Sequence, residues 1–173
     1  MLVAQLSQAP TRIEQRVLSD SLTCRLFADA GHSVSLDDIG RTIYGKPQLR
    51  DSPLHHSISN TRSLSIGVLG PYPIGIDVEA LDRPLRVAHE LLMQRMFASA
   101  AEATACLQHL TLIQAWTAKE AVLKAAGLGL GGGLANVKVA PDGAAAWLND
   151  SRYSLNLWTQ EGFSVAVAEC IRG

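Results

Sequence analysis

Residues 74–79, with the sequence IGIDVE, constrain the fold of this chain more than any other stretch. Their three β-branched side chains favour a buried β-strand. Because successive side chains of a strand point to opposite faces, Asp77 and Glu79 must share the face that these apolar residues leave. Whatever packs against that face has to accommodate two negative charges.

Composition limits the architecture and the kinds of partner. A chain of 173 residues that is 47% hydrophobic and 18% charged can bury a substantial core, as one globular domain or as two small half-domains. Its formal net charge of -1 argues against bulk attraction to nucleic acid or to an acidic membrane surface. We therefore expect neither as a partner, and any bound anion needs a dedicated site.

The cysteines and the first residues indicate a compartment. The three cysteines are far apart and lack CxxC or Cys/His ligand spacing, which is typical of reduced thiols. The opening MLVAQLSQAP has no basic n-region, and no apolar run approaches the roughly 20 residues that a membrane helix needs. We expect a soluble cytoplasmic protein.

Apolar periodicity predicts helices and strands in alternating groups. Helices are expected at about 12–30, at 85–108 with a break near 97–99, and at 111–126. Strands are expected at 54–59, 63–69 and 74–79, and then as an antiparallel meander from about 136 to the C-terminus. Turn chemistry at Gly45, Pro47 and Pro53 precedes the first strands. Helices clustered between strand pairs indicate an α+β fold.

The helix expected at 111–126 carries a carboxylate within its apolar stripe. At about 100° per residue, Glu120 falls among the apolar side chains of this helix, beside Lys124. One interpretation is a simple ion pair, because Lys124 follows four residues later in the favourable order. The other places Glu120 opposite Asp77 and Glu79, where three carboxylates would require a hard divalent cation such as Mg²⁺ or Mn²⁺.

Two motifs make the chain similar to a known family. IGIDVE, followed downstream by WTAKEAVLKAAGLGL, resembles the paired signature (I/V)G(I/V)D(I/V)E and (W/F)(S/T/A)xKEAxxKxxGxGL of the 4′-phosphopantetheinyl transferases. The positions that match the signature are Gly75, Asp77, Glu79, Trp116, Lys119, Glu120, Ala121, Lys124, Gly127, Gly129 and Leu130. A resemblance this dense is specific.

Upstream segments indicate one type within that family. YGKP at 44–47 and HHSISNT at 55–61 resemble the GKP and F-N-x-S-H-S motifs of the surfactin-synthetase-activating type, a monomer built of two similar α+β halves with the active site between them. The small trimeric holo-acyl-carrier-protein synthases lack the GKP segment. The resemblance implies an N-terminal half at 1–72 on the coenzyme A side and a C-terminal half at 73–173 on the metal side.

The resemblance also implies a reaction. Such an enzyme, a holo-[acyl-carrier-protein] synthase, transfers the 4′-phosphopantetheine group of coenzyme A to a serine of an apo acyl, peptidyl or aryl carrier protein and releases adenosine 3′,5′-bisphosphate. Asp77, Glu79 and Glu120 are expected to hold Mg²⁺, with Mn²⁺ as the other candidate. Glu120, or a water on the metal that it orients, is the candidate base. Lys124 is expected to complement the negative charge that develops on phosphate.

The coenzyme A side is where the chain departs from the family pattern. The residues expected to bind coenzyme A are Lys46, Pro47, Ser59, Asn60, Thr61 and Lys119, the last of which reads equally well as a solvated lysine. Asn60 stands where the family usually has a histidine, and only 43 residues precede YGKP. Basic residues that would meet the 3′-phosphate are then missing, or are replaced by Arg12, Arg16 or Arg25.

Two other features have simpler explanations. GLGLGGGL follows a helix and lacks GK[ST], so a helix C-cap and connector explains it better than a phosphate-binding loop. His55 and His56 point to opposite faces of a strand, which argues against a shared metal. A second class of function also stays open: a degenerate relative that binds a carrier protein or nucleotide without turnover.

Overall fold

The computed structural model describes residues 2–6, 11–42, 47–49, 52–84 and 87–171. The helices are α1 (Arg12–Asp29), α2 (His89–Met96), α3 (Ala100–Leu107) and α4 (Leu112–Ala126), with short 3-10 turns at Leu36–Asp38, Gly129–Gly132 and Leu134–Asn136. The strands are β1 (Leu2–Leu6), β2 (Ile39–Arg41), β3 (Pro47–Leu49), β4 (His55–Asn60), β5 (Leu64–Gly70), β6 (Ile74–Ala80), β7 (Val137–Val139), β8 (Ala145–Leu148), β9 (Ser151–Gln160) and β10 (Phe163–Ile171).

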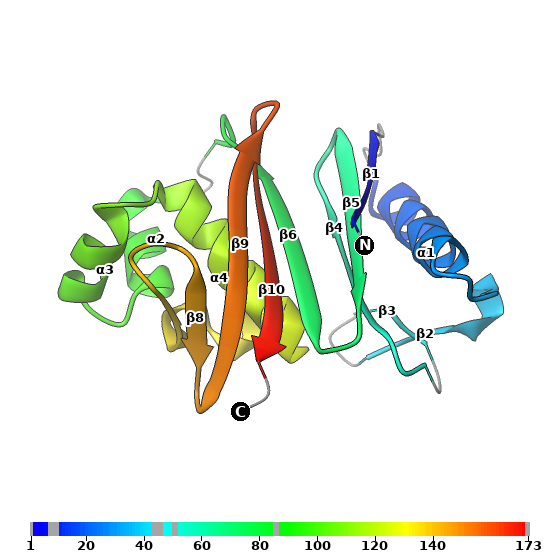
Figure 1. Ribbon diagram of the computed structural model, residues 1–173. Helices are drawn as coiled ribbons and strands as arrows, with labels where there is room; N and C mark the ends of the chain where they lie inside the picture. The colour runs from blue at the N-terminus through cyan, green and yellow to red at the C-terminus, as the bar shows by residue number, and fades with distance from the viewer. Residues whose placement is uncertain (1, 7–10, 43–46, 50–51, 85–86, 172–173) are drawn as a thin grey trace.

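These elements stack in four layers, as Figure 1 shows. Helix α1 covers the outer face of a sheet with the strand order β1-β5-β4. The inner face of that sheet packs beside a second sheet, β6-β10-β9-β8-β7, whose outer face is covered by α4. Strands β2 and β3 form a separate hairpin-like pair, and every pairing among the described strands is antiparallel. The mixed helices and antiparallel sheets confirm the α+β fold class.

Apolar side chains of one strand face fill the space between the two sheets. They are Leu64, Ile66 and Val68 of β5, Ile74, Ile76 and Val78 of β6, and Val165 of β10. The two-residue period of β6 therefore points Gly75, Asp77 and Glu79 to the opposite face, toward α4. This arrangement confirms that the two acids share one face of the strand.

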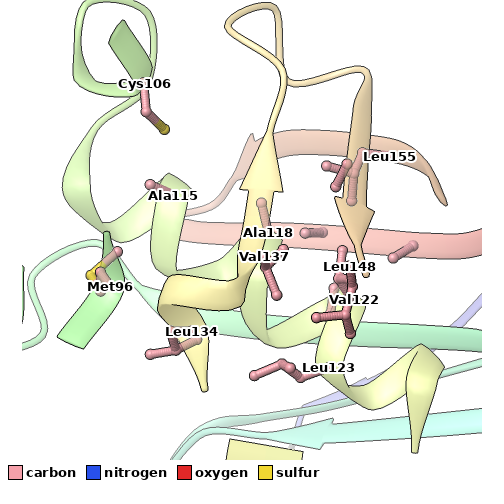
Figure 2. Close-up of a cluster of buried hydrophobic side chains, with 14 of the residues drawn as sticks. Met96, Cys106, Ala115, Ala118, Val122, Leu123, Leu134, Val137, Leu148 and Leu155 are labelled. Atoms are coloured by element: carbon pink, nitrogen blue, oxygen red, sulfur yellow. The ribbon is translucent and has the colours of Figure 1, made fainter. Parts of the chain in front are cut away.

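Small side chains let α4 approach β6 closely. A Cβ atom added to Gly75 would lie 2.0 Å from the carbonyl oxygen of Ala121, which is shorter than any van der Waals contact that a real Cβ atom makes. On the neighbouring strand β10, Ala166 and Ala168 lie opposite Asp77 and Gly75 and are fully buried. Figure 2 shows the continuation of this core, where alanines of α4 and Val122 pack with side chains of β7, β8 and β9.

The sequence predicted these elements with specific errors. The break between α2 and α3 falls at the predicted place, but α2 begins at His89, and residues 85–86 lie outside the described part. Strands β1, β2 and β3 were not anticipated, and Pro47, expected in a turn, begins β3. Gly45 of the predicted turn lies outside the described residues. Whether residues 1–72 and 73–173 form two similar halves stays a prediction.

The apolar residues of α1 are buried in only one part of the helix. Ile13 and Val17 match the helical spacing, yet they are 77% and 60% exposed. Leu22 and Leu26, at the same helical spacing, are buried together with Phe27 against the first sheet. None of the helices in the described residues is long and apolar enough to cross a membrane.

We expect substitution of Gly75 by alanine to destabilise the fold, because the new methyl group would meet backbone atoms of α4 that have no room to move. The expected loss in the free energy of unfolding is about 1–3 kcal/mol or more. Gly40→Ala is the matched control, since its Cβ would lie 3.5 Å from the carbonyl oxygen of Gln48, an ordinary contact. Equal urea midpoints for the two variants would contradict this packing.

Candidate active site

A hydrogen-bonded trio joins β4, β6 and α4 at the centre of the molecule. Asp77 is buried, and its Oδ1 accepts hydrogen bonds from Ser59 Oγ at 2.8 Å and from Lys124 Nζ at 2.7 Å. Lys124 Nζ also donates to Ser59 Oγ at 2.8 Å. A buried carboxylate is costly without such partners, so this trio fixes how the two sheets and α4 meet.

Two serines of β4 form hydrogen bonds with the edge of β6 that has no neighbouring strand. The backbone N–H of Ile76 donates to Ser57 Oγ at 3.1 Å, and that of Val78 donates to Ser59 Oγ at 3.3 Å. These backbone groups point away from β10 and would otherwise be buried without partners. Side-chain hydroxyls therefore take the place of a neighbouring strand, and they hold the Asp77 region of β6 against the first sheet.

Glu79 lies near Asp77 but is held by other groups. Its Oε1 accepts a hydrogen bond from Trp116 Nε1 at 3.0 Å and forms an ion pair with Arg83, whose guanidinium also stacks over the Trp116 ring at 5.2 Å. Burial raises the pKa of Glu79, and the charge of Asp77 raises it further, while Arg83 opposes both effects. Arg83 thus stabilises a carboxylate that its surroundings disfavour.

Glu120 of α4 faces the same acids. Burial, followed by the charge of Asp77, raises the pKa of Glu120 to about 7, with Glu79 adding to the effect and Lys124 and Arg83 opposing it. The charges of all three carboxylates therefore act on one another, and a metal ion shared by them stays a prediction. A carboxyl group with this pKa can exchange a proton near neutral pH.

The three carboxylates do not form a complete metal-binding site in this arrangement. Among the described residues, no group of three or more His, Cys, Asp or Glu side chains is gathered closely enough to hold a metal ion. The donor set still fits Mg²⁺, because Asp77 Oδ2 is buried without a hydrogen-bond partner in the described part of the chain. Mg²⁺ commonly takes only one or two carboxylates and completes its shell with water and substrate phosphates.

Lys119, next to Glu120 in sequence, points elsewhere. Its ammonium is fully buried and donates to the carbonyl oxygens of Met96, Leu134 and Val137 and to Glu102 Oε1. It also lies 4.6 Å from the centre of the Phe97 ring. Burial lowers its pKa, and Glu102 opposes that effect. Consecutive helix positions diverge by about 100°, so Lys119 ties α4 to the α2–α3 region instead of joining the carboxylates.

Two of the predicted coenzyme A residues line one polar cleft, and the others that the structure describes make different contacts. Pro47 and Asn60 line a cleft of about 260 Å³ whose other wall carries Glu120 and Lys124. Ser59 contacts Asp77 and Lys124, while the Thr61 hydroxyl accepts from the backbone N–H of Leu64 in the β4–β5 turn. Lys46 lies outside the described residues.

Sequence reasoning missed the residues that α1 and β2 contribute to this cleft. Ser19 of α1 and Arg41 of β2 also line it, and Ser19 Oγ accepts a hydrogen bond from Asn60 Nδ2 at 2.9 Å. Arg41 forms an ion pair with Asp20. Neither residue belongs to a recognisable motif, and the only available signal was the basic residue just ahead of YGKP.

A second cleft lies one helical turn away on α4. It has a volume of about 380 Å³ and is lined mainly by apolar residues, with Arg83 and Arg95 among its polar ones. Trp116 belongs to this cleft, whereas Glu120 belongs to the polar one. The carboxylates therefore lie between a polar cleft and an apolar cleft.

The model of the 4′-phosphopantetheinyl transferase superfamily matches residues 73–168. The chain belongs to this superfamily. No curated protein matches it. The match begins just before β6 and ends within β10, so it contains Asp77, Glu79 and Glu120 together with the sheet and helix that position them. Membership of the superfamily supports a transferase that moves phosphopantetheine.

The glycine-rich segment after α4 and the two histidines of β4 are arranged as the sequence predicts. Gly127 is the C-cap of α4 and adopts a left-handed φ of 75°, which confirms the C-cap interpretation of the glycine-rich segment. His55 is exposed and His56 is buried against the ring of Phe27 at 5.5 Å, so the two point to opposite faces as expected.

Removing the charge of Glu120 is expected to change how the stability of the metal-free protein depends on pH. Its pKa is raised from 4.5 to about 7, so the folded protein holds this proton more tightly than the unfolded chain. That contribution to stability is fully present below pH 4.5 and is lost as pH rises through about 7. Glu120→Gln has no proton to lose, so its stability should rise relative to the parent across this window, by at most about 1.4 kcal/mol per pH unit.

The measurement is chemical unfolding in the presence of a chelator at several pH values. The matched control is Glu161→Gln, which removes a charge from the exposed β9–β10 turn. Parallel stability curves for the parent protein and Glu120→Gln would show that the Glu120 carboxyl is not disfavoured by its surroundings.

We expect Lys119→Met to unfold far more readily than the parent protein, because it leaves Glu102 and three carbonyl oxygens without their shared cation. Breaking a buried pair of this kind costs about 3–5 kcal/mol. Lys138→Met, on the exposed face of β7, is the control for loss of a lysine. A thermal midpoint for Lys119→Met equal to that of the control would refute the structural role.

Proposed function

We propose that this chain transfers the 4′-phosphopantetheine group of coenzyme A to a serine of an apo acyl, peptidyl or aryl carrier protein, in a Mg²⁺-dependent reaction that releases adenosine 3′,5′-bisphosphate. The observation that carries the proposal is the position of Glu120. Its carboxyl group, with a pKa of about 7, lies with Lys124 on the wall of a polar cleft and interacts with the charges of Asp77 and Glu79.

Mg²⁺ would be held by Asp77 and Glu120, and by Glu79 if that side chain leaves Arg83 and Trp116. The buried Asp77 Oδ2, which lacks a partner in the described part, supports this assignment, as does the oxygen-only donor set. The chemistry that Mg²⁺ supplies when bound is neutralisation of charge on the oxygens of the pyrophosphate.

The side chains of this protein account for the remaining steps. The serine oxygen of the carrier forms a bond to the β-phosphorus, and the bond from that phosphorus to the bridging oxygen of the leaving bisphosphate breaks. Glu120, or a water that it orients, accepts the serine proton. Lys124, held by Asp77 and Ser59, stabilises negative charge on the phosphate oxygens.

The two clefts on either side of the carboxylates offer a separate binding place for each substrate. The attacking and leaving oxygens of a phosphoryl transfer lie roughly in line, so the two substrates approach from opposite sides. We assign the bisphosphate to the polar cleft, which contains Arg41 and Lys124, and the carrier protein to the apolar cleft beside Trp116. On this assignment, α4 contributes residues to the binding sites of both substrates.

We assign the chain to the surfactin-synthetase-activating type, acting as a cytoplasmic monomer. The YGKP and HHSISNT segments favour this type. A helix and a three-stranded sheet, α1 with β1-β5-β4, precede the matched region and supply one wall of the polar cleft, which also supports it. The alternative, a degenerate relative that binds without turnover, lacks a specific observation in its favour, because the acids and Lys124 are all present.

The test is incubation with coenzyme A, Mg²⁺ and a panel of apo carrier proteins, followed by intact-mass measurement of each carrier. We expect one carrier or more to gain the mass of one phosphopantetheine group, and a chelator to abolish the gain. Glu120→Gln should reduce the initial rate by about 10² or more, equivalent to about 2.7 kcal/mol in the barrier, while the metal-free variant is at least as stable as the parent near neutral pH.

Glu161→Gln, in the exposed turn, is the control and should transfer at the parent rate. Bound coenzyme A without a mass gain on any carrier would favour the degenerate alternative. A Glu120→Gln protein that is destabilised but transfers at a near-normal rate would remove Glu120 from the chemistry.

A further inference from the structure

A buried hydroxyl group beside the carboxylates has no partner. Ser164 of β10 is fully buried, and its Oγ makes no hydrogen bond with any of the described residues. Leaving a buried hydroxyl unpaired costs free energy, so native proteins contain few such groups, and each one calls for an explanation such as a catalytic role or a bound ion.

The register of the second sheet places Ser164 directly opposite Glu79. The same pairing of β6 with β10 puts Ala166 opposite Asp77. Val165, between these two residues of β10, belongs to the core between the sheets, so Ser164 and Ala166 point to the other face, where α4 and the carboxylates lie. Directly opposite residues have Cβ atoms about 4.5–5.5 Å apart, which puts the Ser164 hydroxyl within reach of the flexible Glu79 side chain.

Close packing explains the small size of Ser164 but not its hydroxyl group. On the same face of β10, under α4, the buried positions Ala166 and Ala168 are occupied by alanine. Alanine at position 164 would fill a similar space and leave no polar atom without a partner. The serine oxygen therefore lowers stability in the present arrangement, unless another arrangement of its neighbours provides a partner.

Glu79 is the neighbour that can change its arrangement. In this structure its Oε1 is bound by Trp116 Nε1 and by Arg83. Binding one cation together with Asp77 and Glu120 would require the Glu79 carboxylate to leave these two donors. A half-buried carboxylate that loses two donors needs another one, because its charge is costly away from water.

We propose that Ser164 is a positioning residue of the metal site: its hydroxyl donates a hydrogen bond to the Glu79 carboxylate when that side chain turns toward Asp77 and a bound Mg²⁺. The inference rests on the proposed function. Asp77 Oδ2 is also buried without a partner in the described part of the chain, so two unsatisfied oxygens lie next to Glu79 on one face of adjacent strands. Hydrogen bonds to metal-binding side chains fix the orientation of those side chains.

The experiment is titration of the full chain with Mn²⁺, with and without coenzyme A, in which electron paramagnetic resonance measures the unbound ion and Mg²⁺ is the competitor. We expect Ser164→Ala to raise the dissociation constants of both ions roughly ten- to hundredfold. Without metal, its thermal midpoint should equal or exceed that of the parent, because an unpaired buried hydroxyl has been removed. Affinity and stability should thus change in opposite directions.

Thr23→Val is the matched control. The Thr23 hydroxyl is also fully buried, but it donates to the carbonyl oxygen of Ser19 within α1, and Thr23 lines neither cleft. This variant should lose stability and bind Mn²⁺ as the parent does. A Ser164→Ala protein that behaves in the same way would have lost a merely structural hydroxyl, and this result would overturn the proposal.

A double-mutant cycle tests whether Ser164 acts through Glu79. Arg83→Met releases the Glu79 carboxylate from its cation and should tighten Mn²⁺ binding. The gain should be smaller when Arg83→Met is combined with Ser164→Ala, because the released carboxylate then lacks its second donor. Additive effects of the two substitutions on the dissociation constant would show that Ser164 acts independently of Glu79 and would overturn the proposal.

The behaviour of the parent protein separates this inference from the proposed function. A parent that binds the two ions, together with a Ser164→Ala protein of equal affinity, would overturn the role of Ser164 and leave the proposed function intact. A parent that binds neither Mn²⁺ nor Mg²⁺, with or without coenzyme A, would contradict the metal-dependent function and this inference with it.

Discussion

The buried carboxylate of Asp77 is the interaction on which the arrangement of this protein depends. It receives hydrogen bonds from Ser59 of the first sheet and Lys124 of α4, and it lies on a strand of the second sheet. Removing any one partner would leave a charge or a donor buried without compensation. The same bonds that hold three layers together therefore bring Lys124, next to Glu120, to the wall of the polar cleft.

Close packing makes these contacts achievable. Gly75 and the alanines of β10 and α4 leave so little space that the helix lies almost directly on the backbone of β6. Lys119 secures the other side of the same helix by gathering carbonyl oxygens from α2, from the turn at 134–136 and from the start of β7. With both sides of α4 fixed, the fold sets the direction of the Glu120 side chain. Its burial near Asp77 raises the pKa of the Glu120 carboxyl group to about 7.

The two acids of β6 have the same strand face but unlike partners. Asp77 is bound by Lys124, whereas Glu79 is bound by Arg83 and Trp116 at the border of the apolar cleft. A site that combined all three carboxylates would have to free Glu79 from these groups. Asp77 is therefore joined to the polar cleft through Lys124, and Glu79 is joined to the apolar cleft through Arg83 and Trp116.

Local periodicity determined much of this protein from the sequence alone. A two-residue period placed Asp77 and Glu79 on one face, a helical period placed Glu120 beside Lys124, and glycine ended α4, because these patterns follow from backbone geometry within a single element. The tertiary structure decided which elements meet. The ion pair of Arg41 with Asp20, the bond from Ser59 to Asp77 and the inward direction of Lys119 join segments far apart in the chain, and such contacts depend on how whole layers pack.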